Sequence, residues 1–302
     1  MSKVIRIGTR DSKLALWQAN LVKSKLDNLG YNTELIAVKS TGDLDLTKPL
    51  YELGITGIFT KTLDIAMLNG TIDIAVHSMK DVPTLLPEGI VQTAVLERAS
   101  AQDILVTRGE LDESKNCTIA TGSLRRKAQW LSRYPHHNVV GLRGNVNSRL
   151  KKLADSDWQG AIFARAGLER IDILPPDFIP LDWMIPAPAQ GAMVVVALRD
   201  DDFMIEATKQ LNHYISAICT RLEREFLQVL EGGCTAPIGA HAEIINKDIL
   251  FKGVLLSLDG QTKLEIEKII IPDHLESAGR TMALEILDNG GKELMKLIKE
   301  SQ

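Results

Sequence analysis

Residues 3–39 read KVIRIGTRDSKLALWQANLVKSKLDNLGYNTELIAVK, and their pattern decides the fold class. The β-branched run at 3–7 predicts a strand, and the polar turn after it offers Asp11 or Ser12 as the cap of a helix that Gly30 ends. That helix carries an apolar stripe at helical spacing, made by Leu14, Trp17, Leu21, Val22 and Leu26. A second strand at 33–39 favours a parallel pair with a right-handed crossover, so ligands are expected at the carboxyl ends of the strands.

The same pattern recurs along the first two thirds of the chain. Runs at 72–76, 118–120, 138–142 and 161–164 each predict a strand that leads into a polar or cationic loop. With the strand at 3–7 they make five strand ends. The polar residues at or near these ends are Arg10, Ser12, Lys80, Asp81, Ser123, Arg125, Arg126, Arg143, Arg149 and Arg170. We predict an α/β fold in which these strand ends face one cleft.

Length and charge add two constraints. The 302 residues exceed what one hydrophobic core usually serves, which predicts two or three domains. Beyond residue 212 the pattern changes to a long amphipathic helix, a Gly-Gly-Cys turn, three strand-like segments and a helix pair, which indicates a separate α+β domain. Ten Lys or Arg oppose three Asp or Glu at 121–170, yet the net charge is −4, so the chain as a whole has no basic footprint for nucleic acid.

The cysteines and the hydropathy of the chain indicate in which cellular compartment the protein works. The three cysteines, Cys117, Cys219 and Cys234, form no CxxC pair, which disfavours a disulfide framework and suits a reducing compartment. The N-terminal residues lack the apolar core of a signal peptide, and the apolar run at 192–198 is too short to span a bilayer. We expect a cytoplasmic protein that does not enter a membrane.

The arginines at the strand ends are the strongest chemical signal. An arginine fork binds a carboxylate or phosphate through two hydrogen bonds, and helix N-termini add unpaired amides. Any single arginine can simply be solvated, but several at strand ends favour an anionic ligand. Since no dinucleotide or nucleoside-triphosphate glycine motif occurs, the pattern favours carboxylates as the anion.

Cys234 and Asp81 are the candidates for covalent and acid–base chemistry. Glycines and a proline around Cys234 predict an exposed loop, although an incidental loop cysteine is the alternative, whereas Cys117 and Cys219 have the spacing of buried residues. Asp81 can stabilise positive charge or move a proton, or it can merely form a turn, and His77 beside it can be structural. No His/Cys/carboxylate cluster has metal-ligand spacing, so no metal is expected.

Taken together, the loops resemble those of the porphobilinogen deaminase family. The most specific combination is HSMKDVP at 77–83, SLRR at 123–126 and EGGC at 231–234. Further segments match the family's order and approximate spacing from end to end, at 8–12, 14–19, 142–146, 166–168, 190–192 and 230–239.

The resemblance implies three domains: 1–98 with 191–212, 99–190, and 213–302. The first two are similar to type II periplasmic binding-protein domains around a cleft, and the third carries Cys234 on a loop that faces it. A dipyrromethane cofactor is implied, bound to Cys234 through a thioether. Four porphobilinogen molecules are added with loss of ammonia, hydrolysis frees hydroxymethylbilane, and a monomer is the family's usual form.

By the same resemblance, Asp81 is the catalytic residue, which assists loss of the aminomethyl nitrogen and stabilises a cationic azafulvene-like intermediate. The cofactor-binding positions, besides Cys234, are Ser78, Lys80, Asp81, Thr121, Ser123, Arg125 and Arg126. The positions around the substrate and the growing chain are Arg10, Ser12, Gln18, Arg143, Arg149 and Arg170. Each porphobilinogen brings an acetate and a propionate, which gives the many arginines a chemical reason.

Two positions depart from the family pattern, and two other function classes stay open. Ile55-Thr56-Gly57 stands where many members have Gly-Lys-Gly, inside a weakly periodic stretch at 40–58 that predicts a lid, and Ala189 stands where glycine is frequent. A binding protein of the periplasmic type would share the fold of two domains but predicts a signal peptide. An RNA-binding module would use the cationic residues at 121–170, where few aromatic residues can stack bases.

Overall fold

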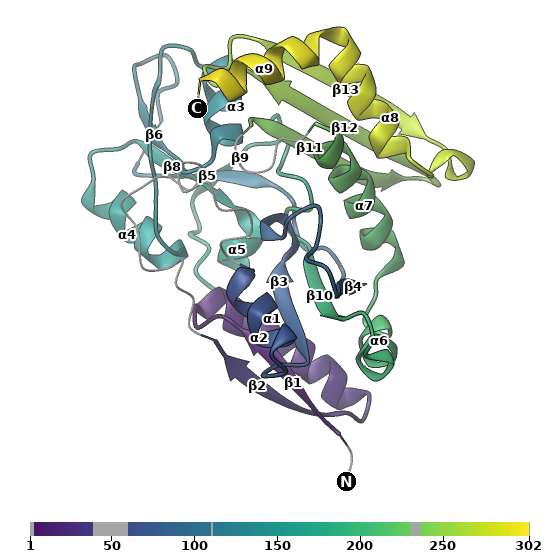
Figure 1. Cartoon of the computed structure of the whole chain (residues 1–302). Helices are drawn as coiled ribbons and strands as arrows, with labels where there is room; N and C mark the ends of the chain where they lie inside the picture. Colours follow the sequence, from purple (N-terminus) through teal and green to yellow (C-terminus); the bar gives the residue numbers. More distant parts are fainter. Residues whose placement is uncertain (1–2, 39–59, 110, 231–235, 302) are drawn as a thin grey trace.

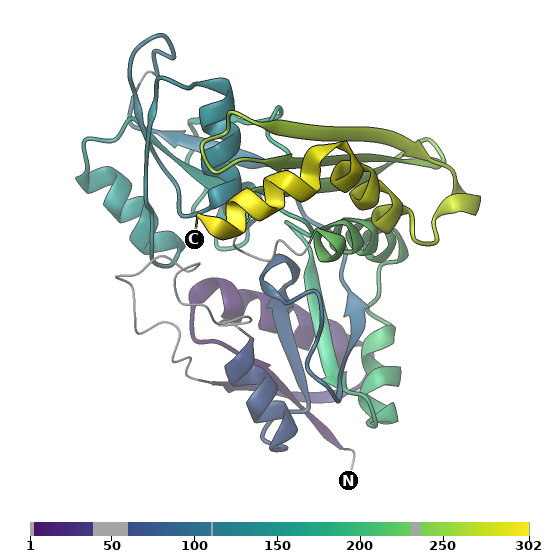
Figure 2. The same ribbon diagram turned by 45° about the horizontal axis from the view of Figure 1, so that its top comes forward.

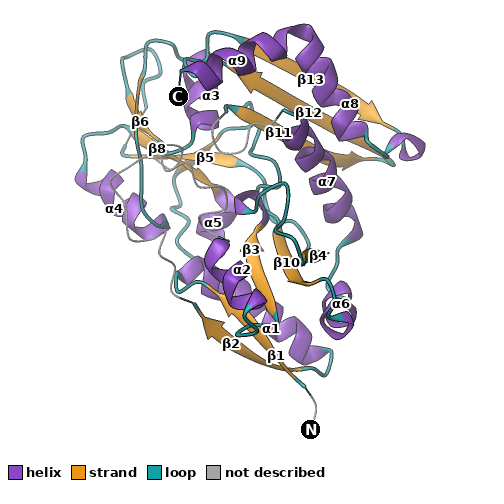
Figure 3. Ribbon diagram, viewed as in Figure 1, coloured by secondary structure: helices purple, strands orange, loops and turns teal. Residues whose placement is uncertain are grey.

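Within the described residues, three sheets organise the molecule, and each has helices packed against it (Figures 1 and 3). The computed structural model describes residues 3–38, 60–109, 111–230 and 236–301. The predicted lid at 40–58 and Cys234 therefore lie outside the described residues. Parallel strands joined through helices confirm the predicted α/β class, and an α+β part follows at the C-terminal end (Figure 3).

The first sheet contains the strand–helix–strand unit that opens the chain. Strand β1 (Val4–Thr9) pairs in parallel with β2 (Asn32–Ala37) and with β3 (Ile74–Ser78), which confirms the predicted parallel pair. Strand β10 (Met193–Leu198) lies antiparallel between β3 and β4 (Ile90–Val95), so the order is β2-β1-β3-β10-β4. One face of the sheet packs on α1 (Lys13–Asn28) and α6 (Asp202–Lys209), and the other on α2 (Lys61–Leu68).

Helix α1 forms where the sequence predicts it and buries Val22 and Leu26 of the predicted stripe, together with Gln18 and Ala19 outside it. Ser12 caps it, since its hydroxyl accepts a hydrogen bond from the Ala15 amide at 3.3 Å. The buried residues are Gln18, Ala19, Val22 and Leu26, whereas Trp17 of the predicted stripe is 37% exposed. The polar Gln18 points inward because its amide donates to the Ser78 hydroxyl at 2.9 Å, and hydrophobic periodicity does not detect such a contact.

The second sheet repeats the strand order of the first. Strand β6 (Thr118–Ala120) pairs in parallel with β7 (Asn138–Val140) and β8 (Gly160–Ala164), and β5 (Asp103–Thr107) lies antiparallel between β8 and β9 (Phe178–Pro180). Its order is thus β7-β6-β8-β5-β9. The helices of this part are α3 (Leu124–Arg133), α4 (Val146–Asp155) and α5 (Arg165–Glu169).

The chain passes from the first sheet to the second and then returns. Strand β10 joins the first sheet only after the second is complete, and residues 189–191 make the return. Ala189 adopts a φ of +60° there, a left-handed conformation that is costly for a residue with a side chain. Gly191 has a φ of +84°, and a Cβ on it would lie 2.5 Å from the Ala99 carbonyl oxygen, so the crossover needs glycine at this position.

The C-terminal part is built as the sequence predicts, with a helix, three strands and a helix pair. Helix α7 (Tyr214–Val229) precedes the antiparallel strands β11 (Ile238–Ile245), β12 (Asp248–Leu256) and β13 (Lys263–Ile270). The final pair is α8 (Ala278–Ile286) and α9 (Lys292–Glu300). All three helices share one core with the sheet, and Figure 2 shows α8 and α9 lying along it. No helix among the described residues is long and apolar enough to cross a membrane.

Candidate active site

A cavity of about 780 Å³ is lined by all three parts of the molecule. Its polar lining residues include Arg10, Ser12, Ser78, Lys80, Asp81, Ser123, Arg125, Arg126, Arg143, Asn145, Arg149 and Gln190. Apart from Gln190 on the crossover, they end or follow β1, β3, β6 and β7, so four of the five predicted strand ends do face one cavity. From the C-terminal part, Leu227, Ala236 and Ile238 also line it.

Three helices begin at this cavity. Ser12, Ser123 and Asn145 cap α1, α3 and α4, and each cap residue lines the cavity with the first residue of its helix. The first turn of a helix presents unpaired amide N–H groups and the positive end of the helix dipole. Added to the arginines, this arrangement attracts anions.

Arg125 and Arg126 share a buried carboxylate that the sequence reasoning missed. Asp103, at the start of β5, is fully buried and lies 2.7 Å from Arg125 Nη1 through its Oδ2. Its Oδ1 accepts from Arg126 Nε at 3.0 Å and Nη2 at 2.7 Å. Although burial alone raises the pKa of a carboxyl, these two cations hold the pKa of Asp103 far below its usual value. The cluster therefore keeps a net positive charge at neutral pH.

Two cavity-lining guanidinium groups retain unused donors. Arg125 Nη1 also donates to the Ile185 carbonyl at 2.8 Å, but its Nε is buried and has no hydrogen-bond partner within the described residues. The same holds for Nη1 of Arg143. A buried donor without an acceptor costs about 1–3 kcal/mol, so both groups suit a ligand that supplies oxygen acceptors.

Lys80 is close enough to these cations and to Asp81 for their charges to act on it. Its Nζ donates to Gln190 Oε1 at 3.2 Å, and Gln190 Nε2 in turn donates to Asp103 Oδ1 at 2.8 Å. Burial first, and then Arg126, lower the pKa of Lys80 to about 8, against the opposing effect of Asp81. Gln190 is 1% exposed, and its connecting role was missed although it lies in the matched segment 190–192.

Asp81 itself is exposed at the cavity, at the end of the short 3-10 turn Met79–Asp81. His77, two residues before that turn, is buried and does not line the cavity. Burial and the charge of Arg10 lower the pKa of His77 to about 4, so its ring is neutral at pH 7. Between the two, only Asp81 can offer charge to a ligand in the cavity.

Arg149 reaches the cavity from the second turn of α4. Its Nε donates to the Gly144 carbonyl at 2.7 Å, and burial together with Arg126 lowers the pKa of Arg149 to about 10. It remains a cation at neutral pH, next to Arg143.

Three predicted site residues lie behind the cavity and do not line it. Gln18 donates to Ser78, and the Thr121 hydroxyl accepts from the Ser123 amide at 3.2 Å. Arg170, from the fifth predicted strand end, donates to the Gly191 carbonyl at 2.6 Å and lies 5.7 Å from the Trp17 ring centre. The sequence predicts that Arg170 lies near the cleft. It does not predict that the guanidinium links the part of the chain that contains the second sheet to the crossover at Gly191.

The two cysteines within the described residues have the buried positions that the sequence predicts. Cys117 and Cys219 are buried, and burial raises the pKa of both thiols, to about 11 for Cys219. Neither is a reactive thiol. Cys234 lies outside the described residues, but Leu227 and Ala236, the lining residues on either side of it in the sequence, both contact the cavity. No group of His, Cys, Asp or Glu in the described part of the chain could hold a metal ion.

Comparisons with known proteins match the whole chain. Residues 5–206 match the family description "Porphobilinogen deaminase, dipyromethane cofactor binding domain", and residues 217–288 match "Porphobilinogen deaminase, C-terminal domain". A porphobilinogen deaminase of Chlorobium chlorochromatii is 38% identical over 312 residues, which cover 100% of each chain. One of Geotalea uraniireducens is 40% identical over 299 residues, covering 97% of this chain and 94% of the relative.

Solved structures of lower similarity also align. The VFT2 domain of Bordetella pertussis BvgS is 11% identical with a TM-score of 0.41, over 69% of this chain and 86% of that chain. A Salmonella typhimurium periplasmic binding protein with high arginine specificity is 12% identical with a TM-score of 0.41, over 72% of this chain and 94% of that chain.

Proposed function

Because the chain belongs to the porphobilinogen deaminase family, we propose that the cavity described above is where its cofactor and substrate bind and react. The protein is a transferase of tetrapyrrole biosynthesis with a dipyrromethane cofactor. The observation that carries the proposal is the convergence of three helix N-termini, a set of arginines and Asp81 on one cavity. Such a cavity is built for a ligand with several carboxylates.

The residues present fit the cofactor. Its acetate and propionate groups would supply the acceptors that Arg125 Nε and Arg143 Nη1 lack. Ser78 and Lys80 at the end of β3, and Ser123, Arg125 and Arg126 after β6, would hold it, with Cys234 as its covalent attachment. When bound, the cofactor would supply the pyrrole carbon to which the first substrate unit is joined.

Asp81 acts on the substrate's charge. Its carboxylate accepts a hydrogen bond from the aminomethyl nitrogen of porphobilinogen, which leaves as ammonia when the C–N bond breaks. The same carboxylate then stabilises the positive charge left on the pyrrole.

The other predicted site residues bind the carboxylates of the substrate and of the growing chain, or orient residues that do. Arg10, Ser12, Arg143 and Arg149 line the cavity and act directly. Gln18, Thr121 and Arg170 act through neighbours: Gln18 orients Ser78, Thr121 orients Ser123, and Arg170 holds the crossover at Gly191.

The division into domains 1–98 with 191–212, 99–190, and 213–302 is part of the proposal. The return of β10 to the first sheet supports the split of the first domain, and the separate core of α7–α9 with the third sheet supports the last boundary. We also propose that the protein works as a monomer in the cytoplasm, where the free thiols of Cys117 and Cys219 suit a reducing environment.

Intact-protein mass spectrometry tests the proposal. The purified protein should carry the mass of a covalent dipyrromethane, and Cys234→Ser should fold but lack both the stable adduct and nearly all activity. Cys219→Ser is the control, since a buried thiol with a pKa of about 11 is not expected to carry the adduct. A normal adduct on Cys234→Ser, or its loss from Cys219→Ser, would contradict the assignment.

A further inference from the structure

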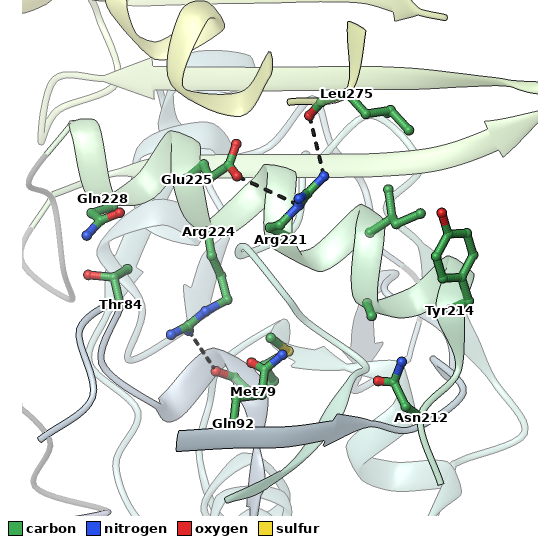
Figure 4. Close-up of a pocket in the computed structure, with 12 residues that line it drawn as sticks. Met79, Thr84, Gln92, Asn212, Tyr214, Arg221, Arg224, Glu225, Gln228 and Leu275 are labelled. Carbon is green, nitrogen blue, oxygen red and sulfur yellow. Dashed lines mark hydrogen bonds and ion pairs between the residues drawn. The ribbon is translucent and has the colours of Figure 1, made fainter. Parts of the chain in front are cut away.

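Arg224 holds the backbone around Asp81 from a different part of the molecule. It lies on α7 of the C-terminal part, and its guanidinium reaches the turn after β3 (Figure 4). Nη1 donates to the Val82 carbonyl at 2.9 Å and to the Met79 carbonyl at 3.3 Å, and Nη2 donates to the Pro83 carbonyl at 2.6 Å. The three carbonyls flank Lys80 and Asp81 on both sides.

Placing a guanidinium where water reaches it only in part costs desolvation free energy, which its hydrogen bonds must offset. Arg224 is partly buried, and burial lowers its pKa to about 10, so it is still a cation at neutral pH. Within the described residues no carboxylate forms an ion pair with it, and its charge is balanced by the three carbonyl dipoles alone. A charged guanidinium that donates hydrogen bonds to three backbone oxygens of one turn fixes the position of that turn.

The turn has few other constraints of its own. Its backbone is tied by Met79 N to the Ala192 carbonyl at 3.0 Å and by Val82 N to the Met79 carbonyl at 3.2 Å. Pro83 has no N–H to contribute. Since the Asp81 side chain is exposed and accepts no hydrogen bond within the described residues, its backbone decides where its carboxylate stands.

We infer that Arg224 is a positioning residue for the reaction: by binding the Met79, Val82 and Pro83 carbonyls, it fixes the Asp81 carboxylate in the cavity relative to α7. The inference rests on the proposed role of Asp81. Because a misplacement of about 1 Å in a catalytic group can cost about a hundredfold in rate, release of this turn should lower turnover without abolishing binding.

Arg221 provides a matched control on the same helix. Figure 4 shows it one turn earlier, pointing away from Met79 toward Leu275 and Glu225. It is half-exposed and lies 3.4 Å from the Leu275 carbonyl and 3.8 Å from Glu225. Both arginines line a second cavity of about 610 Å³, so Arg221→Met changes the charge and volume there while it leaves the Asp81 turn untouched.

The test compares kcat and KM of the holoenzymes, each normalised to the cofactor-bearing fraction measured by intact mass. We expect Arg224→Met to lower kcat about tenfold to a hundredfold with KM changed less than about threefold, and Arg221→Met to match wild type. Arg224→Lys, which keeps the charge but not the fork, should recover part of the loss. Normal kcat per holoenzyme in Arg224→Met, with only a lower yield of folded protein, would overturn the inference. If Arg224→Met does not fold, Arg224→Lys with wild-type kcat would do the same.

A double-mutant cycle separates this inference from the proposed function. If Arg224 acts through Asp81, adding Arg224→Met to Asp81→Asn should cost less than about threefold beyond Asp81→Asn alone. Additive losses would place Arg224 outside the action of Asp81 and contradict the inference while leaving the proposed function intact. Near wild-type turnover of Asp81→Asn would instead remove the proposed catalytic role of Asp81, on which the inference rests.

Discussion

At the scale of single residues, one carboxylate decides how the two adjacent arginines behave. Arg125 and Arg126 follow β6, as the sequence predicts, but Asp103 binds both of them from β5. An isolated buried guanidinium is very costly, and this shared partner makes two adjacent ones possible at the cavity wall. Local sequence shows only an acidic residue before an apolar strand, so its partners emerge only when β5 is placed beside β8.

Asp81 gives the first prediction at this scale. Asp81→Asn should keep the shape of the cavity and the covalent cofactor but lower turnover by roughly a hundredfold or more, the usual effect of removing a positioned acid–base group. Steady-state kinetics and intact mass of the same sample measure the two effects separately. Asp81→Glu, which keeps the charge on a longer side chain, should retain more activity. Turnover near wild type in Asp81→Asn would exclude Asp81 from the mechanism.

Lys80 gives a prediction about pH. Because the pKa of Lys80 is lowered to about 8, the cation is mostly present at pH 7 and mostly lost at pH 9. We expect kcat/KM to fall as pH rises through about 8, when the positive charge beside Asp81 and Gln190 disappears. Lys80→Arg keeps its proton throughout this range, so its alkaline limb should move to higher pH. The same limb in both proteins would assign it to another group.

At the scale of elements, local pattern predicts helices and parallel strands well but not long-range pairing. The strand, helix and strand at 3–39 form as expected, and so does the order of elements after residue 212. Strand β10 is buried on both faces and therefore appears as one apolar run, which indicates burial but not the sheet that receives it. The burial of Gln18 on α1 was missed for a similar reason, since the Ser78 hydroxyl that accepts its hydrogen bond lies sixty residues away in the sequence.

The same limit applies to the site. Strand-end position was enough to bring Arg10, Ser123, Arg143 and Arg149 to the cavity wall. It was not enough for Arg170, whose carbonyl partner at Gly191 lies on the crossover, or for Gln190, which joins Lys80 to Asp103. These contacts depend on how the sheets are placed relative to each other, which no local pattern encodes.

Helix α4 carries the prediction that belongs to this scale. Arg149→Leu removes a cation from the cavity wall, where it is proposed to bind a carboxylate of the elongating chain. A charge-assisted hydrogen bond is worth about 1.5–3 kcal/mol, enough to slow one addition about tenfold to a hundredfold. We therefore expect enzyme bearing one or more added pyrroles to accumulate during turnover, as seen by intact mass.

Lys151→Met is the control for this experiment. Lys151 lies on the same helix but is exposed and pairs with Asp155 on the surface at 2.6 Å, so its loss should leave the distribution of intermediates unchanged. Arg149→Lys should restore the distribution only in part, because the ammonium lacks the fork. A uniform rate loss in Arg149→Leu, with the wild-type distribution, would show that Arg149 does not position the chain.

At the scale of the whole molecule, one buried carboxylate joins the three parts. Glu223 on α7 is fully buried, and its Oε1 accepts from Arg98 Nη1 at 2.6 Å and from the Ala242 amide at 2.7 Å. Its Oε2 accepts from Arg98 Nη2 at 3.1 Å and from the Ala189 amide at 2.6 Å. Arg98 follows β4, Ala189 lies on the crossover and Ala242 on β11, which helps to explain why the left-handed Ala189 is held in place.

The charge of Glu223 makes this junction sensitive to acid. Burial alone would raise its pKa, but Arg98 above all, and then His241, hold the pKa of Glu223 below its usual value of 4.5. A carboxyl with a lowered pKa in the folded state stabilises the fold above its unfolded-state pKa. That stability is lost as the pH falls from about 4.5 through the lower folded-state value.

Glu223→Gln should therefore destabilise the protein at pH 7 and much less in acid. Removing one partner of a buried ion pair costs about 3–5 kcal/mol, because Arg98 would stay buried without its counter-charge. As the pH falls from about 4.5 through the lower folded-state pKa of Glu223, the wild-type protein loses this stability, and its protonated Glu223 then resembles the amide, so the gap between the two unfolding curves should close. Glu225→Gln is the control on the same helix: Glu225 is partly exposed and lies 3.8 Å from Arg221, so its loss should cost less than about 1 kcal/mol at any pH. Thermal unfolding at pH 7 and at several pH values from about 4.5 downward measures both variants, and a Glu223→Gln gap that stays constant over this whole range would show that the carboxylate's shape, and not its charge, joins the three parts.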